Sequence, residues 1–151
     1  MNPMDAIKQT YFQECDELLG DLERGLLSLQ DGEGDNETIN AVFRAAHSVK
    51  GGAGAFGFEA LVAFSHVFET ALDEMRSGRL DPSPAVVGAM LRAADVVSDL
   101  VSAAKGGAVV DEARAAALAA ELEALTAGQD AASAAATAAA PAAGEAQGDE
   151  W

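Results

Sequence analysis

The sequence predicts an all-α protein: an up-and-down antiparallel four-helix bundle with an additional fifth C-terminal helix. Apolar residues recur at steps of three and four along five separate runs, which is the spacing of one helix face. No run alternates polar and apolar residues as a half-buried strand would. Short stretches rich in glycine, proline or aspartate separate the runs, and short connections place consecutive helices antiparallel.

An acidic, glycine-rich turn at residues 32–36 separates the first two helices. Asp35 or Asn36 in this turn can cap the second helix. That helix reaches a cluster of glycines and could simply end at Gly51. The apolar spacing continues beyond this glycine, so we predict that the helix runs to about Ala55. The apolar stripe of the first helix consists of Ile7, Tyr11, Cys15, Leu18, Leu22, Leu26 and Leu29.

The third and fourth helices have clear boundary signals. The third run begins after Gly57 and closes at Gly78. Ser83 offers a capping hydroxyl and Pro84 suits the first helical position, so together they predict the start of the fourth helix. The glycines at 106–107 are expected to stop it.

The fifth helix is predicted from about Asp111 to Leu125, with its end at Gly128. Residues 127–151 contain no Leu, Ile, Val, Phe or Met and are rich in alanine. Such a segment buries too little apolar surface to offset the entropy of ordering, although its first alanines could be helical. We therefore predict a helical domain over 1–126 followed by a flexible, acidic linker.

Composition narrows the classes of function. The formal net charge of −16 argues against nucleic acid as a partner, because each phosphate contact would oppose general repulsion. Cys15 is the single cysteine, which excludes a disulfide framework and suits a reducing compartment. We see neither a signal peptide nor a membrane-spanning segment, so we expect a cytoplasmic protein whose partners are other proteins.

The second helix carries an anomaly around His47. Four glycines lie within residues 51–57, and each glycine inside a helix costs about 1 kcal/mol relative to alanine. On a helical wheel His47 lies at the edge of the buried arc, with Gly51 and Gly54 beside it and Lys50 one turn further on. An imidazole flanked by residues without side chains is open to another protein. The combination indicates a nucleophilic or phosphate-accepting histidine.

The third helix supplies a complement to this histidine. His66, Glu69 and Asp73 are spaced three and four apart and share one face. If the second and third helices are neighbours, Glu69 can approach His47 across the groove. A carboxylate that accepts the Nδ1–H of a neutral imidazole fixes the tautomer and leaves the Nε2 lone pair facing outward.

Each of these residues also has an ordinary structural interpretation. His47 could be a half-buried helical histidine, and His66 a histidine that faces solvent. The carboxylates could be solvated charges, and the glycines could allow close helix packing. Close packing does not account for the histidine and lysine beside the glycines. The aromatic residues that more simply belong to the core than to a binding surface are Phe56 and Phe58.

The segment Ile39–Phe58, with the run His-Ser-x-Lys-Gly-x-Ala-x-x-Phe-Gly, resembles the phosphorylation-site segment of histidine phosphotransfer (Hpt) domains. The best match is to the N-terminal domain of bacterial chemotaxis histidine kinases, the CheA family, and it extends over about residues 5–125. The resemblance implies that the motif histidine, which accepts the γ-phosphoryl of ATP, is His47. It also implies that Lys50 is the motif lysine, and that Glu69 and His66 are the supporting residues of the next helix.

The resemblance further implies what this chain does not contain. It has no glycine-rich nucleotide loop and no ATP-binding box, so it would be an acceptor and carrier with no bound cofactor. A separate kinase domain, in the same protein or in another, would supply ATP and Mg²⁺. An aspartate of a response-regulator receiver domain, with its own Mg²⁺, would take the phosphoryl group. The expected docking surface consists of Gly51, Gly52, Gly54, Ala55, Phe56 and Phe58.

Three other interpretations stay open at this point. The chain could be the Hpt intermediate of a phosphorelay outside chemotaxis. It could be a helical interaction module without chemistry. It could also bind a metal through His47, His66 and Glu69, although the Glu-x-x-His pairing of di-metal bundles is missing and Lys50 would repel a cation.

Overall fold

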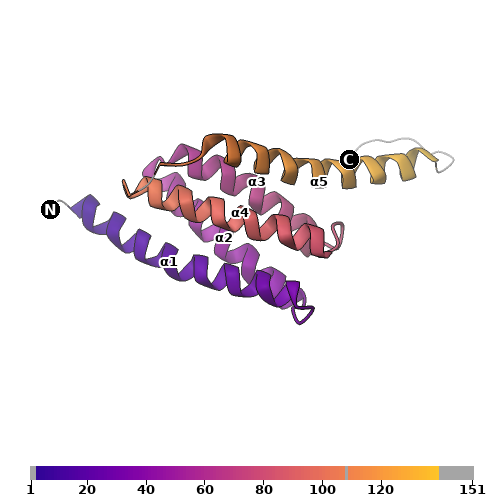
Figure 1. Ribbon diagram of the computed structural model, residues 1–151, viewed down its shortest axis with the longest axis horizontal. Coiled ribbons are helices and arrows are strands. Elements are labelled where there is room, and N and C mark those ends of the chain that lie inside the picture. Colours follow the sequence, from indigo (N-terminus) through magenta and orange to yellow (C-terminus); the bar gives the residue numbers. More distant parts are fainter. Residues whose placement is uncertain (1–2, 108, 140–151) are drawn as a thin grey trace.

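The computed structural model describes residues 3–107 and 109–139, with side chains up to residue 127. Within these residues the chain forms five α-helices and no strand, which confirms the all-α class (Figure 1). The helices are α1 (Pro3–Gln30), α2 (Asn36–Phe56), α3 (Glu59–Arg76), α4 (Pro84–Ala104) and α5 (Glu112–Ala139).

The start of α2 is fixed by a reciprocal cap. The Asp35 carboxylate accepts a hydrogen bond from the backbone N–H of Thr38 at 3.0 Å, and the Thr38 hydroxyl accepts from the backbone N–H of Asp35 at 3.3 Å. Both donors would otherwise lack a helical partner. At its other end α2 runs through the glycine cluster to Phe56 and closes on Gly57, whose φ of 75° suits a residue without Cβ. The predicted continuation of this helix is confirmed.

The start of α4 also follows the sequence signal. The Ser83 hydroxyl accepts a hydrogen bond from the backbone N–H of Val86 at 3.3 Å, and Pro84 is the first helical residue. Proline has no N–H to leave unpaired at that position, and its fixed φ suits the first turn.

The prediction for the end of the fifth helix is wrong. Helix α5 does not stop at Gly128 but continues to Ala139, so the first part of the predicted linker is helical. A single glycine costs about 1 kcal/mol in a helix, and the many alanines around it are the strongest helix formers. The predicted linker residues 140–151 lie outside the described part of the chain.

The helices pack so that α1 contacts α2 and α4, α3 contacts α2 and α4, and α5 contacts α3 and α4. Figure 1 shows α1, α4 and α5 one above another, with α2 and α3 behind them. The buried core between the helices includes Leu22, Leu26, Val49, Leu61, Phe68, Leu72, Met90, Val97 and Leu122.

The apolar stripe predicted for α1 is wrong at its beginning. Ile7 is 55% exposed, whereas Tyr11 and Cys15 are buried. The N-terminal end of α1 extends past the other helices (Figure 1), and the apolar side chains Met4 and Ile7 near this end stay exposed. Periodicity identifies the face of a helix but not how far its partners extend.

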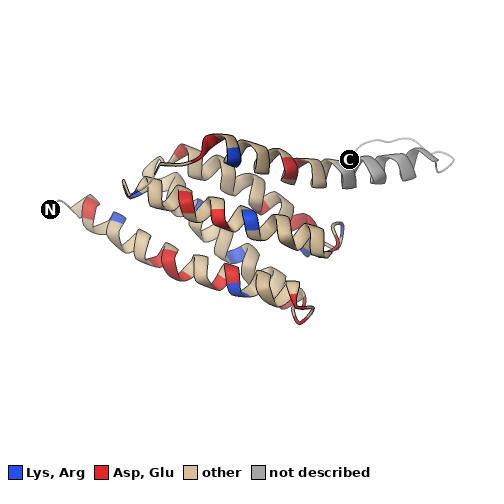
Figure 2. Cartoon of the chain, viewed as in Figure 1, with Lys and Arg blue, Asp and Glu red and all other residues tan. Residues whose placement is uncertain are grey.

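Acidic side chains are distributed along several helices rather than gathered on one (Figure 2). They are visible along α1, α4 and α5, interspersed with fewer basic residues. None of the described helices is both long enough and apolar enough to cross a membrane.

Candidate functional site

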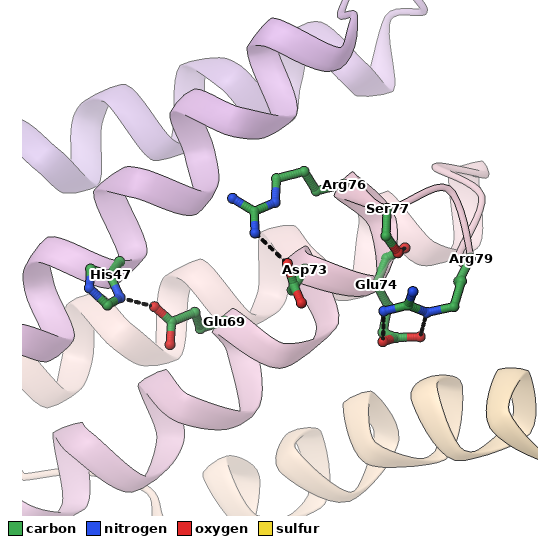
Figure 3. A network of polar contacts seen from close by, with 7 residues as sticks. All are labelled: His47, Glu69, Asp73, Glu74, Arg76, Ser77 and Arg79. Atoms are coloured by element: carbon green, nitrogen blue, oxygen red, sulfur yellow. Dashed lines mark hydrogen bonds and ion pairs between the residues drawn. The ribbon is translucent and has the colours of Figure 1, made fainter. Parts of the chain in front are cut away.

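The candidate site lies where the middle of α2 faces α3. Ala46 and Val49 point into the core, and His47, between them in sequence, lies at the rim of the helix with 63% of its side chain exposed. Its Nδ1 is hydrogen-bonded to Oε2 of Glu69 on α3 (Figure 3). The structure thus brings together the histidine and the carboxylate that the sequence suggested.

Glu69 is held from two sides by α2. Only 10% of its side chain is exposed, and its second oxygen, Oε1, accepts a hydrogen bond from Nζ of Lys50. Burial alone would raise the pKa of Glu69. The hydrogen bonds and charges of Lys50 and His47 outweigh that effect, so the pKa of this carboxyl lies below its ordinary value. Glu69 is therefore an ionised acceptor at neutral pH.

This arrangement settles which nitrogen of His47 is available. An ionised carboxylate can only accept, so Nδ1 must carry the proton that it shares with Glu69. In the neutral ring the lone pair then lies on Nε2, on the opposite side of the imidazole from Glu69. With the ring largely exposed, Nε2 is reachable from solvent.

The glycines of α2 differ from one another. A Cβ added to Gly51 or Gly54 would meet nothing within 4 Å, so both leave open space next to His47. A Cβ on Gly52 would lie 2.1 Å from the Tyr11 ring of α1. The assignment of Gly52 to the docking surface is therefore corrected: this glycine lets α1 and α2 approach closely.

Tyr11 is a residue that the sequence placed in the core without a further role. Its hydroxyl donates a 2.6 Å hydrogen bond to the backbone carbonyl of Val49, within the glycine-rich part of α2. Burial raises the pKa of the Tyr11 hydroxyl well above its ordinary value. The tyrosine thus joins α1 to the turn of α2 that carries Lys50.

The predicted docking residues at the end of α2 are partly used for packing. Phe56 and Phe58 are half-buried and lie 5.5 and 6.5 Å, ring centre to ring centre, from Tyr11. Phe12 stacks on Phe58 at 5.7 Å. Ala55 is exposed. The two phenylalanines therefore pack against the core, which was their simpler interpretation, and remain partly exposed.

His66 is exposed on α3, one turn before Glu69. Its backbone carbonyl accepts a hydrogen bond from the Thr70 hydroxyl at 2.9 Å, but no hydrogen bond or ion pair joins its ring to another described side chain. The structure does not bring His66 into the network of His47 and Glu69. Nor do any three His, Cys, Asp or Glu residues of the described ranges gather as a metal site would require.

Phe43 adjoins His47, and Arg76 in turn adjoins Phe43. The Phe43 ring lies nearly parallel to the imidazole, at 10° and 6.2 Å between ring centres. The Arg76 guanidinium, from the last turn of α3, lies 3.9 Å from the centre of the Phe43 ring. Phe43 precedes His47 by four residues, so its place on the same face was available from the sequence. The contact with Arg76 depends on the register of α3 against α2, which the sequence does not reveal.

Comparison with known proteins agrees with this geometry. The family model of the Hpt domain matches residues 6–128. The chain is 61% identical over 122 residues to the chemotaxis protein CheA of Rhizobium meliloti. This match covers 81% of the chain and 16% of that protein. It is 43% identical over 105 residues to CheA of Salmonella typhimurium, covering 70% of this chain and 16% of that protein. The chain therefore spans about a sixth of the length of these relatives.

A solved structure is also similar: the phosphorylated P1 domain of CheA3 in complex with CheY6 from R. sphaeroides. The TM-score is 0.68 at 25% sequence identity, and the match covers 80% of this chain and 98% of that one. The family model thus spans most of this chain, and the structural match extends over nearly the whole of the similar chain. The chain belongs to the Hpt domain family.

Proposed function

We propose that this chain is the phosphoryl carrier of a chemotaxis two-component system. His47 accepts the γ-phosphoryl group of ATP held by a separate kinase domain and passes it to an aspartate of a response-regulator receiver domain. The observation that carries the proposal is the state of one ring: Nδ1 is bonded to an ionised, buried Glu69, and Nε2 is free and exposed.

In the uptake step the Nε2 lone pair forms a bond to the γ-phosphorus. The bond from that phosphorus to the bridging oxygen breaks, and ADP leaves with the electron pair. The imidazole gains positive charge as the N–P bond forms, and Glu69 stabilises that charge through Nδ1–H. In the second step an aspartate oxygen of the receiver attacks the phosphorus, the N–P bond breaks and the ring returns to its neutral form.

Lys50 supports the uptake of the phosphoryl group by His47 in two ways. Its ammonium is bound to Oε1 of Glu69, which keeps the carboxylate charged and oriented toward His47. It also places a positive charge one turn from His47, where it would offset the charge of the phosphoryl oxygens. The His66 ring, one turn from Glu69, would tune the same groove through its charge, as its place in the family motif implies.

The partner would approach over the open part of α2. Gly51 and Gly54 offer space beside His47, and Ala55 and the exposed faces of Phe56 and Phe58 extend this surface. A carrier must release its partner after each transfer, so we expect an interface below about 1,200 Å² in total. ATP and Mg²⁺ would be bound by the kinase domain, and a second Mg²⁺ by the receiver.

The remaining parts of the proposal concern architecture and location. The helix contacts and the short connections support an up-and-down bundle of α1 to α4, with α5 as an accessory helix on α3 and α4. Residues 1–126 would be the Hpt domain and 127–151 the connection onward. A carrier that serves an ATP-dependent kinase works in the cytoplasm.

The test uses the two histidines of the chain. Wild type, His47→Gln and His66→Gln are incubated with the isolated kinase domain of a CheA relative and γ-labelled ATP. We expect acid-labile label on wild type and on His66→Gln, the latter at a reduced rate, and none on His47→Gln. Transfer of the label to a receiver domain of the same system completes the test.

Because each variant keeps one histidine, the pair identifies the acceptor. Label on His47→Gln at the wild-type level would overturn the site. Absence of label on wild type, with the kinase shown to be active on its own P1 domain, would overturn the function.

A further inference from the structure

The imidazole of His47 has a second neighbour besides Glu69, the ring of Phe43, at 6.2 Å between ring centres. We propose that Phe43, Arg76 and Asp73 form an aromatic clamp that sets the tilt of the His47 ring and so aims Nε2 at the incoming phosphorus. The clamp rests on the proposed function for its purpose, but its geometry is a property of the unphosphorylated chain.

The first contact is between rings on one helix. Phe43 and His47 are one turn apart on α2, and their rings are almost parallel, with 10° between their planes. The hydrogen bond to Glu69 fixes the direction of Nδ1, but a single hydrogen bond lets the ring rock about that direction. A flat neighbour on one face of the imidazole limits that motion.

The second contact restrains Phe43 itself. It is only half-buried, so the core alone does not fix its ring. The Arg76 guanidinium lies 3.9 Å from the centre of that ring, within the range of a cation–π contact. The contact joins the last turn of α3 to the first half of α2.

The third contact orients Arg76. Its guanidinium forms a 2.5 Å ion pair with Asp73, one turn earlier on α3, and Figure 3 shows the two side chains meeting on the side of α3 that bears Glu69. A shallow hollow of about 190 Å³, lined by Phe43, Glu69, Thr70, Asp73 and Arg76, lies within this group. One face of α3 thus holds His47 directly through Glu69 and indirectly through Arg76 and Phe43.

The chemical consequence concerns alignment. In-line attack requires the Nε2 lone pair to point at the phosphorus, and small errors in placing reacting atoms cost large factors in rate. Lys50 and Glu69 set the charge of the site, whereas the clamp sets the direction of the nucleophile. Phe43, Arg76 and Asp73 are therefore positioning residues rather than catalytic ones.

The experiment compares Phe43→Leu with Phe43→Tyr, which keeps the ring, and Arg76→Gln with Arg76→Lys, which keeps the charge. Phosphorylation by a kinase domain is measured as kcat and KM for the chain as substrate. We expect Phe43→Leu to lower kcat about tenfold and Arg76→Gln about threefold with KM nearly unchanged, and we expect each conservative variant to recover most of the rate. The double variant should be no slower than Phe43→Leu, because Arg76 acts through the ring.

A second readout does not depend on phosphorylation. NMR relaxation of the His47 ring in the free chain should show greater motion in Phe43→Leu and Arg76→Gln, with the Nδ1–H tautomer retained. The inference is overturned if ring motion is unchanged in both, or if the two rate effects multiply in the double variant. If wild type accepts no phosphate, the proposed function fails, and the ring motion still decides whether the clamp exists. Arg76 is exposed, so its variants keep the test valid if Phe43→Leu does not fold.

Discussion

Ion pairs join α2 to α3 and α4 to α5, and the two contacts differ in kind. On the α4–α5 face, Arg92 forms two 2.9 Å hydrogen bonds with Glu121, and 41% of the Glu121 side chain is exposed. In the α2–α3 groove only 10% of the Glu69 side chain is exposed, and each of its oxygens is bound by a different residue of α2.

The difference separates a structural contact from a chemical one. Exposed ion pairs contribute little, because water solvates both charges nearly as well when they are apart. A nearly buried carboxylate must stay charged through its donors, and here one of these donors is the ring that would react. The Arg92–Glu121 pair adds only a weak contact between α4 and α5, whereas Glu69 controls the proton of His47.

The largest effect is expected from Glu69→Gln. The amide would offer an N–H as readily as a carbonyl to Nδ1, so the ring loses its fixed tautomer. We expect the rate of phosphate uptake to fall about 10- to 100-fold, by analogy with the loss of a carboxylate that orients a metal-ligating histidine. Single-turnover labelling with a kinase domain measures it.

Glu121→Gln is the matched control for this change. It removes an equivalent carboxylate from the exposed pair, and uptake should stay at the wild-type rate. If both variants lost uptake rate equally, the net negative charge of the chain, and not the hydrogen bond to His47, would govern phosphate uptake.

The glycines of α2 give the next largest effect, on stability. Gly52→Ala would place a methyl group 2.1 Å from the Tyr11 ring, and the strain should destabilise the chain by about 1–3 kcal/mol. Gly51→Ala meets open space and should stabilise α2 by up to about 1 kcal/mol. Urea unfolding of both variants measures their free energies of unfolding. Similar free energies for Gly51→Ala and Gly52→Ala would contradict the packing described for Gly52.

The contribution of Glu69 to stability should depend on pH. Its pKa is lowered in the folded chain from an ordinary value of 4.5, so the folded state favours the ionised form. The stability that this provides is fully present above pH 4.5 and is lost as the pH falls through the folded-state pKa. The difference in unfolding free energy between wild type and Glu69→Gln should therefore shrink below pH 4.5. A difference that grows on acidification would contradict the direction of the shift.

The smallest effect is expected on the α4–α5 face. Arg92→Gln removes an exposed ion pair and should lower the free energy of unfolding by less than about 1 kcal/mol. The loss should be smaller still at high salt, which screens the pair. Thermal unfolding at low and high ionic strength measures it. A loss of several kcal/mol would show that α5 depends on this pair for docking.

The sequence sufficed where the signal was local. Asp35 and Ser83 marked helix starts through their own capping side chains, and the spacing of Val49, Ala53 and Phe56 carried α2 through its glycines. His47 and Glu69 could be paired because each lies at the edge of an apolar stripe, and two adjacent helices bring such edges together.

It failed where the answer depended on a distant neighbour. Gly51 and Gly52 are neighbouring glycines that the sequence cannot tell apart. In the structure only Gly52 packs against the Tyr11 ring. Ile7 has the correct spacing for the core, yet no other helix buries its side chain, which stays 55% exposed. The stack of Arg76 on Phe43 needs the register of α3 against α2, which no pattern within one helix encodes.

The central claim is that Glu69 occupies Nδ1 of His47 and leaves Nε2 as the nucleophile. The position of the phosphoryl group on the ring tests it most directly, by nitrogen-15 and phosphorus-31 NMR of the phosphorylated chain with labelled histidine. We predict phosphate bonded to Nε2 of His47, with Nδ1 still protonated. Phosphate on Nδ1, or on His66, would contradict the account.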